Sequence, residues 1–216
     1  MQRRYSGLHI LFIWILILIT LSLIYYMGTT LLPFDGFVSA ALVSSFLSLV
    51  TVIGVRFDLI EVMSPGKSWF LYLASLSPVL GALFISILSS NQWSSIDTFN
   101  YRDWLVFILW IPIVEEIFFR LGLGRFLRKV AGDKLAVYGT ALAFAMLHSG
   151  LIAFDFESVG VPLGPFLLSV ACEILFIKTG RLCYSILFHM SCNSTVLVFT
   201  AWDARWLEWL NFLYIS

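Results

Sequence analysis

One segment of the chain, residues 104–124, is apolar enough to cross a membrane yet carries three charged side chains, Glu115, Glu116 and Arg120. Each such group costs roughly 2.5–3.5 kcal/mol at the centre of a bilayer, so charge within a span usually marks a functional site. On a helix, Glu116 and Arg120 are four residues apart and share a face. Glu115 is rotated from Glu116 by about 100°. The spacing therefore predicts that Arg120 holds Glu116 and leaves Glu115 available for chemistry.

The composition around this segment is that of a membrane protein. Apolar residues make up 60% of the 216 residues and charged residues 12%, and the zero net charge gives no basis for nucleic-acid binding. Apolar runs of spanning length are separated by glycine, proline and other turn-forming residues. We predict an all-α, polytopic membrane helix bundle of about seven transmembrane helices, with a range of about six to eight. The runs fall near 8–27, 37–55, 69–89, 104–124, 135–150, 162–178 and 182–200.

The basic residues indicate the orientation of this bundle. With a cytoplasmic N-terminus, the inner side receives every Lys and Arg except Arg102, Arg205 and the intramembrane Arg120. This bias predicts a multi-pass protein of a cell inner membrane, with its C-terminus on the outer side. Residues 1–103 are expected to form N-terminal transmembrane helices and 104–200 the helix core, all within a single integral membrane domain. Tryptophans at helical spacing in 201–216 predict an interfacial amphipathic C-terminal helix.

Other polar side chains also stand in apolar runs. His148 ends the fifth run, and His189 and Asn193 lie on one helical face of the seventh. At about 1.5 Å per residue from the inner ends, these groups and Glu115 all fall in the middle of a roughly 30 Å core. They are therefore expected to meet at one site. The alternative is a set of independent helix–helix hydrogen bonds.

Three further residue types have structural interpretations. Glu173 is expected to be structural and to reach the interface near Lys178. Pro112 leaves the Ile108 carbonyl without its helical donor and favours a kink one turn before Glu115. The cysteines show no zinc-ligand spacing, and their placement in apolar segments indicates buried thiols; they are Cys172, Cys183 and Cys192.

The motifs resemble those of a known family. Glu115-Glu116-Ile-Phe-Phe-Arg120 has the form Glu-Glu-x-x-x-Arg, Phe144-Ala-Met-Leu-His148 the form Phe-x-x-x-His, and His189-Met-Ser-Cys-Asn193 the form His-x-x-x-Asn. In order and spacing they are similar to the CPBP family of CAAX proteases and bacteriocin-processing enzymes, also called Abi. The resemblance extends from about Trp104 to Phe199, with the first hundred residues outside it.

The resemblance implies a glutamic-type intramembrane endopeptidase related to the type II CAAX prenyl endopeptidases. It assigns water activation to Glu115 with help from His148, and oxyanion stabilisation to His189 and Asn193, whereas Glu116 and Arg120 support the site. A buried carboxylate can act as general base, and His and Asn can donate hydrogen bonds to an oxyanion. No cofactor or metal is expected. A zinc-dependent variant is the chemical alternative, although the chain lacks His-Glu-x-x-His and its ligands would come from three helices.

Functions of other classes stay open at this point. One is a non-catalytic membrane scaffold or bacteriocin-immunity-type protein, against which the complete motif set argues. Another is a small proton-coupled transporter, against which the absence of an obvious internal repeat argues. The expected partners are a membrane-associated protein or peptide substrate and the lipid bilayer. The 150–165 connection is either a gate for substrate or an interfacial loop.

Overall fold

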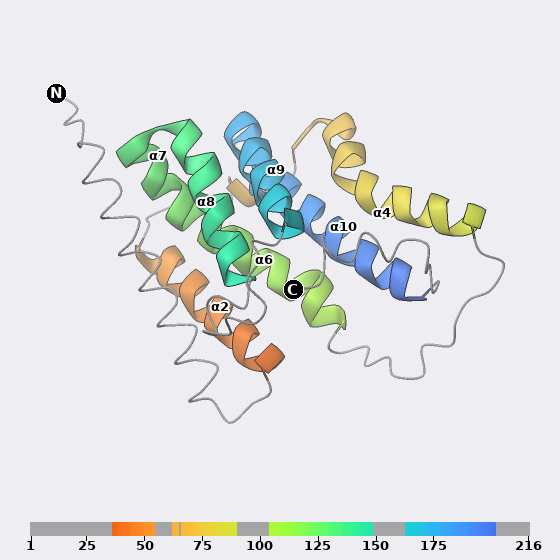
Figure 1. Cartoon of the computed structure of the whole chain (residues 1–216). Coiled ribbons are helices and arrows are strands. Elements are labelled where there is room, and N and C mark those ends of the chain that lie inside the picture. Colours follow the sequence, from red (N-terminus) through yellow and green to blue (C-terminus); the bar gives the residue numbers. More distant parts are fainter. Residues whose placement is uncertain (1–35, 55–61, 65, 90–103, 149–162, 202–216) are drawn as a thin grey trace.

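Figure 1 shows the computed structural model of the chain, whose described residues are 36–54, 62–64, 66–89, 104–148 and 163–201. Within these ranges the chain forms helices and no strand. The all-α prediction is therefore confirmed for this part of the chain. The helices are α2 (Gly36–Gly54), α4 (Trp69–Ser89), η1 (Val106–Trp110), α6 (Ile111–Glu116), η2 (Ile117–Gly124), α7 (Arg125–Ala131), α8 (Asp133–Leu147), α9 (Leu163–Thr179) and α10 (Leu182–Ala201).

The helix ends lie close to the ends of the predicted apolar runs, and glycine sets two of them. Gly132 has a φ of 86° between α7 and α8, and Gly180 has a φ of 64° after α9. This left-handed region is readily adopted only by glycine, which is why glycine commonly ends helices. The Gly180 N–H donates to the Phe176 carbonyl (2.8 Å) and closes the last turn of α9.

By length and composition, one helix within the described ranges, Trp69–Ile87, qualifies as a membrane span. Two shorter apolar stretches are Ala41–Ile53 and Leu182–Val198. The number of spans and the orientation therefore stay predictions. The predicted first span at 8–27, most of the 150–165 connection and residues 202–216 of the predicted C-terminal helix lie outside the described residues.

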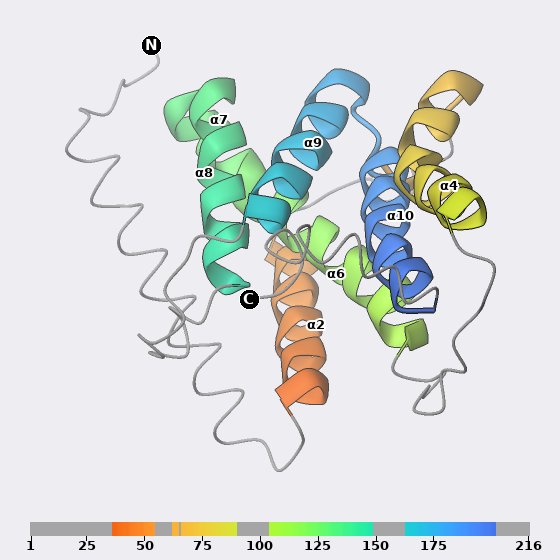
Figure 2. The ribbon, with the colours of Figure 1, turned by 45° about the vertical axis from the view of Figure 1, so that its right-hand side comes forward.

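The arrangement of the helices places α6 between α2 and α10 (Figures 1 and 2). α10 packs along α4 on one side and contacts α9 on the other, and α9 packs along α8. One apolar cluster joins η2 and α7 to α8, and it consists of Phe119, Leu123, Leu127, Ala136, Ala143 and Phe144. A second joins η2 to α10 through Leu121, Leu182 and Ile186. These contacts hold the charged segment in the interior of the helix packing.

One uninterrupted helical run, Trp104 to Ala131, carries the charged segment and changes register along its length. The segments η1 and η2 on either side of α6 are π-helical. In η1 the Ile111 N–H donates to the Val106 carbonyl, five residues back instead of four. π-helical turns are rare and occur frequently at functional sites. Glu115 and Glu116 thus lie in a short α-helical segment that is flanked on both sides by π-helical segments.

α2 supports this run with hydroxyl groups. The Ser48 hydroxyl, buried at the contact, reaches the Val114 carbonyl. Trp110 Nε1 donates to Ser45 Oγ (2.9 Å). These contacts hold the last residue of η1 and the middle of α6 against α2, which belongs to the first hundred residues that the family motifs do not include.

Candidate functional site

The ion pair predicted from spacing is present on α6 and η2. Arg120 Nε donates to Glu116 Oε2 (2.7 Å) and Arg120 Nη2 to Glu116 Oε1 (3.1 Å), with both side chains fully buried. A two-point contact of this kind is among the stronger hydrogen-bonded ion pairs in proteins. Glu116 is therefore held by Arg120, and the pairing predicted from the four-residue spacing is confirmed.

Glu173 on α9 completes the charged cluster, and its location corrects the sequence interpretation. Its side chain is fully buried within the helix packing and pairs with Arg120 and Arg128 instead of extending to the surface beside Lys178. Arg120 Nη1 donates to Glu173 Oε2 (3.2 Å) and to Ser169 Oγ (3.0 Å). Arg128 Nη1 donates to the other Glu173 oxygen. Glu173 is thus held between two arginines from other helices, and its structural role stays a prediction.

Sequence reasoning missed this cross-helix pairing because Arg120 and Glu173 are separated by 53 positions. One signal was present in the chain. A Cβ at Gly124 would lie 2.8 Å from both carboxylate oxygens of Glu173, so glycine is required where α9 approaches η2. A glycine on an apolar helix opposite a buried acid is an indication of close approach.

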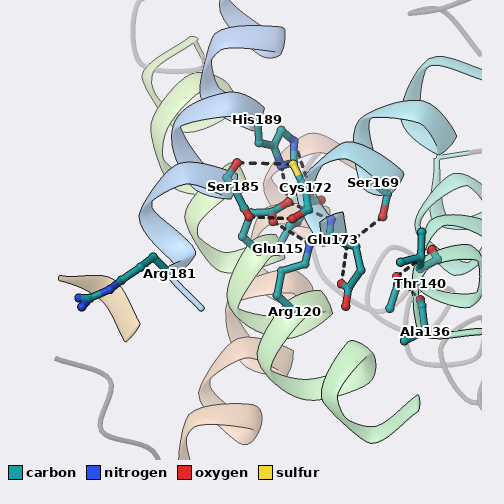
Figure 3. A network of polar contacts seen from close by, with 12 residues as sticks. Glu115, Arg120, Ala136, Thr140, Ser169, Cys172, Glu173, Arg181, Ser185 and His189 are labelled. Atoms are coloured by element: carbon teal, nitrogen blue, oxygen red, sulfur yellow. Dashed lines mark hydrogen bonds and ion pairs between the residues drawn. The ribbon is translucent and has the colours of Figure 1, made fainter. Parts of the chain in front are cut away.

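Glu115 lies near both histidines, and Figure 3 shows it in one polar network with His189 and Arg120. Its Oε1 lies 3.9 Å from His148 Nε2 and its Oε2 lies 3.7 Å from His189 Nε2. Among the described residues, the buried Oε2 has no partner within hydrogen-bonding distance. Distances of this size are too long for direct hydrogen bonds and are suited to a bridging molecule. The structure therefore brings Glu115, His148 and His189 together from α6, the C-terminal end of α8, and α10.

His148 is oriented by its own helix. Its Nδ1 lies 2.8 Å from the Phe144 carbonyl, and since a carbonyl only accepts, Nδ1 donates. Its ring stacks on Phe144, with centroids 4.3 Å apart, and the Phe144 ring also meets His189 edge-on at 5.6 Å. In the neutral form, His148 therefore presents Nε2 as an acceptor toward Glu115. Phe144, the first residue of the Phe-x-x-x-His motif, contacts both histidines.

His189 links the two glutamates. Its Nδ1 lies 3.1 Å from Glu116 Oε1, an oxygen that Arg120 also bonds, and its Nε2 faces Glu115. Because Glu116 is held as a carboxylate by Arg120, His189 Nδ1 is the donor in this contact. The Glu116–Arg120 pair thus fixes the ring orientation of His189, as second-shell carboxylates do for histidines in metal sites.

Asn193, one turn after His189 on α10, makes a contact that the sequence did not suggest. Its Nδ2 donates to the Phe107 carbonyl in η1 (2.8 Å). One amide N–H is therefore used by the backbone, and the second N–H is the one that an oxyanion role would use.

The zinc alternative would use Glu115 with the two histidines. Within the described part of the chain, no group of three or more His, Cys, Asp or Glu side chains has the arrangement of a metal site. The atoms that meet here are the two Glu115 carboxylate oxygens and two imidazole nitrogens. Atoms of these types can bind zinc, and the same groups also perform general acid–base chemistry.

Comparison with known proteins identifies a family match for the segment that carries the candidate site. Residues 98–195 match the family described as type II CAAX prenyl endopeptidase Rce1-like. All three motifs fall inside the matched range, and the match confirms the family resemblance of this segment. No curated protein and no solved structure gives a significant match.

Proposed function

We propose that this protein is an intramembrane endopeptidase. Its residues 98–195 match the family described as type II CAAX prenyl endopeptidase Rce1-like. It hydrolyses a peptide bond in a membrane-associated protein or peptide. The observation that supports this most strongly is the meeting of Glu115 with His148 and His189, at 3.9 and 3.7 Å, on three separate helices. Ionisable groups gathered within a membrane-embedded helix bundle are costly unless they serve a function.

In the proposed reaction, Glu115 takes a proton from water while His148 Nε2 accepts the second hydrogen bond of that water. Both groups are acceptors in the observed geometry, so a water molecule between them would be oriented by donating to each. Its oxygen then attacks the carbonyl carbon of the scissile bond. General-base assistance of this kind is worth about 10²–10⁴ in rate.

His189 and Asn193 stabilise the oxyanion of the tetrahedral intermediate in this proposal. Since His189 Nδ1–H is used by Glu116, donation from Nε2 requires the imidazolium form. Collapse of the intermediate breaks the C–N bond, and the proton held by Glu115 passes to the leaving amine. Removing one oxyanion donor typically costs about 10²–10³ in rate.

The test compares the termini of membrane proteins, by mass spectrometry, in cells expressing wild type or Glu115→Gln at equal level. We expect fragments that are present only with wild type, because glutamine keeps the shape of the side chain but cannot accept the proton. The matched control is Ser77→Ala, an exposed hydroxyl on α4 that bonds its own helix. Fragments that persist with Glu115→Gln would contradict the assignment of Glu115.

The same experiment separates the alternatives. A scaffold or immunity-type protein produces no new termini with wild type and keeps its phenotype in Glu115→Gln. A zinc-dependent protease produces the termini but loses them when purified protein is incubated with a chelator and regains them on adding Zn²⁺. We expect activity to be unchanged by the chelator.

A further inference from the structure

The Phe107 carbonyl in η1 lacks the backbone donors that a helix supplies from four and five residues ahead. In an α-helical register its partner would be the Ile111 N–H, but that group donates to Val106. In the π-helical register the partner would be residue 112, which is proline and has no N–H. In this register the missing N–H at residue 112 leaves the Phe107 carbonyl without its π-helical donor, and the prediction for the Ile108 carbonyl stays a prediction.

Asn193 supplies the missing donor from another helix. Its Nδ2 lies 2.8 Å from the Phe107 oxygen, and both Asn193 and Pro112 are buried. A half-buried carbonyl without a donor destabilises the fold, so the contact offsets a penalty that the proline creates. Pro112 and Asn193 are separated by 81 positions in the sequence. The Asn193 side chain nevertheless supplies the hydrogen bond that the proline cannot donate.

The location of this bond connects it to the candidate site. Phe107 and Pro112 precede Glu115 on the same helical run, and Asn193 follows His189 by one turn of α10. The bond thus ties the helix that carries Glu115 to the helix that carries His189, close to where Glu115 Oε2 and His189 Nε2 lie 3.7 Å apart. A shift of α10 against η1 would change that separation.

We propose that Pro112 and Asn193 form a matched pair, in which the proline opens the Phe107 carbonyl and the asparagine binds it, so that Asn193 positions Glu115 against His189. Asn193 is then a positioning residue through the amide N–H that binds Phe107. This role is independent of the oxyanion role proposed for its second N–H. The inference rests on the proposed function only for its activity measurement.

A double-mutant cycle tests the hydrogen bond without any substrate. Asn193→Ala is expected to lower the unfolding midpoint in detergent micelles by about 2–6 °C. In a Pro112→Ala background the loss should shrink to under half of that, because residue 112 then has an N–H that can reach Phe107. Ser194→Ala is the matched control, since Ser194 bonds Met190 within α10, and it should show no such dependence on residue 112. An equal loss from Asn193→Ala in both backgrounds overturns the pair.

The positioning role has its own measurement, the labelling of Glu115 by a hydrophobic carbodiimide, quantified by mass spectrometry. Asn193→Ala should change the labelling rate of Glu115 at least threefold, and adding Pro112→Ala should restore it toward the wild-type rate. If the Asn193–Phe107 bond were only structural, Asn193→Ala would lower the unfolding midpoint. The labelling rate of Glu115, measured at temperatures below that midpoint, would then be unchanged. That result would overturn the positioning role.

Activity on the substrate found by terminal analysis gives the third arm. Asn193→Ala is expected to reduce kcat by about 10–100-fold, with KM within about twofold, because a displacement of about 1 Å at a reacting group can cost 10²-fold. Pro112→Ala should recover part of this loss, and the part not recovered is the oxyanion contribution. An equal loss in both backgrounds means that Asn193 acts on the reacting atoms alone. If wild type cleaves nothing, the proposed function fails while the unfolding and labelling experiments still decide this inference.

Discussion

Arg120 provides hydrogen-bond donors for the buried carboxylates of the charged segment and of α9. Its guanidinium bonds two carboxylates and one hydroxyl, from Glu116, Glu173 and Ser169, and all of it is buried. A lysine has no planar fork and cannot reach the same set of acceptors. Arg120 therefore stabilises the interior by pairing with both carboxylates.

Replacing Arg120 should destabilise the protein strongly. Arg120→Leu leaves Glu116 and Glu173 without their shared partner, and breaking a buried pair costs about 3–5 kcal/mol. Arg120→Lys keeps the charge and should cost less than Arg120→Leu but clearly more than zero. The measurement is the unfolding midpoint in detergent, with the exposed Lys129→Gln on α7 as the control. A midpoint for Arg120→Leu equal to that of the control would refute the pairing.

At the scale of elements, the approach of α9 to η2 depends on one missing side chain. A Cβ at Gly124 would lie 2.8 Å from the Glu173 oxygens and from the Phe119 carbonyl, all closer than real Cβ atoms come. Gly81 on α4 has nothing within 4 Å of such an atom. The two glycines are therefore a matched pair for testing how tightly the helices meet.

Gly124→Ala should lower the free energy of unfolding by about 1–3 kcal/mol, as overpacking of a filled interior does. Gly81→Ala should be neutral or stabilise by up to about 1 kcal/mol, since alanine favours helix over glycine. Urea or thermal unfolding in micelles measures both. If Gly124→Ala were as well tolerated as Gly81→Ala, the close contact of Glu173 with η2 would not exist in the protein.

The helices themselves and the local ion pair were predictable, because apolar run length and four-residue spacing are properties of neighbouring residues. The π-helical register was not, and it makes Phe107 a carbonyl whose backbone donor would come from residue 112, a proline. Register depends on tertiary contacts such as Asn193 on Phe107 and Ser48 on Val114, which join helices far apart in the sequence. The burial of Glu173 was unpredictable for the same reason, since its partners Arg120 and Arg128 lie on other helices.

At the scale of the whole molecule, the orientation in the membrane is a prediction with a direct measurement. The helix ends on either side of the turn between α7 and α8 carry exposed basic residues, among them Lys129 and Lys134, and positive residues favour the inner side. A cysteine at Lys134→Cys should react with a membrane-impermeant maleimide in inside-out vesicles and not in right-side-out vesicles. Wild type gives the background from the native cysteines. Reaction in right-side-out vesicles only would invert the predicted topology.

The chain of ion pairs from Glu116 through Arg120 and Glu173 to Arg128 also bears on how the protein is made. Synthesis proceeds from the N-terminus, so the run that carries Arg120 and Arg128 leaves the ribosome before α9. The Glu116–Arg120 pair can form within that run at once, which lowers the cost of inserting it. Glu173 has no such partner on α9 and is neutralised only by guanidinium groups already in place. We therefore expect α9 to pack later, against a charged run whose own ion pair has already formed.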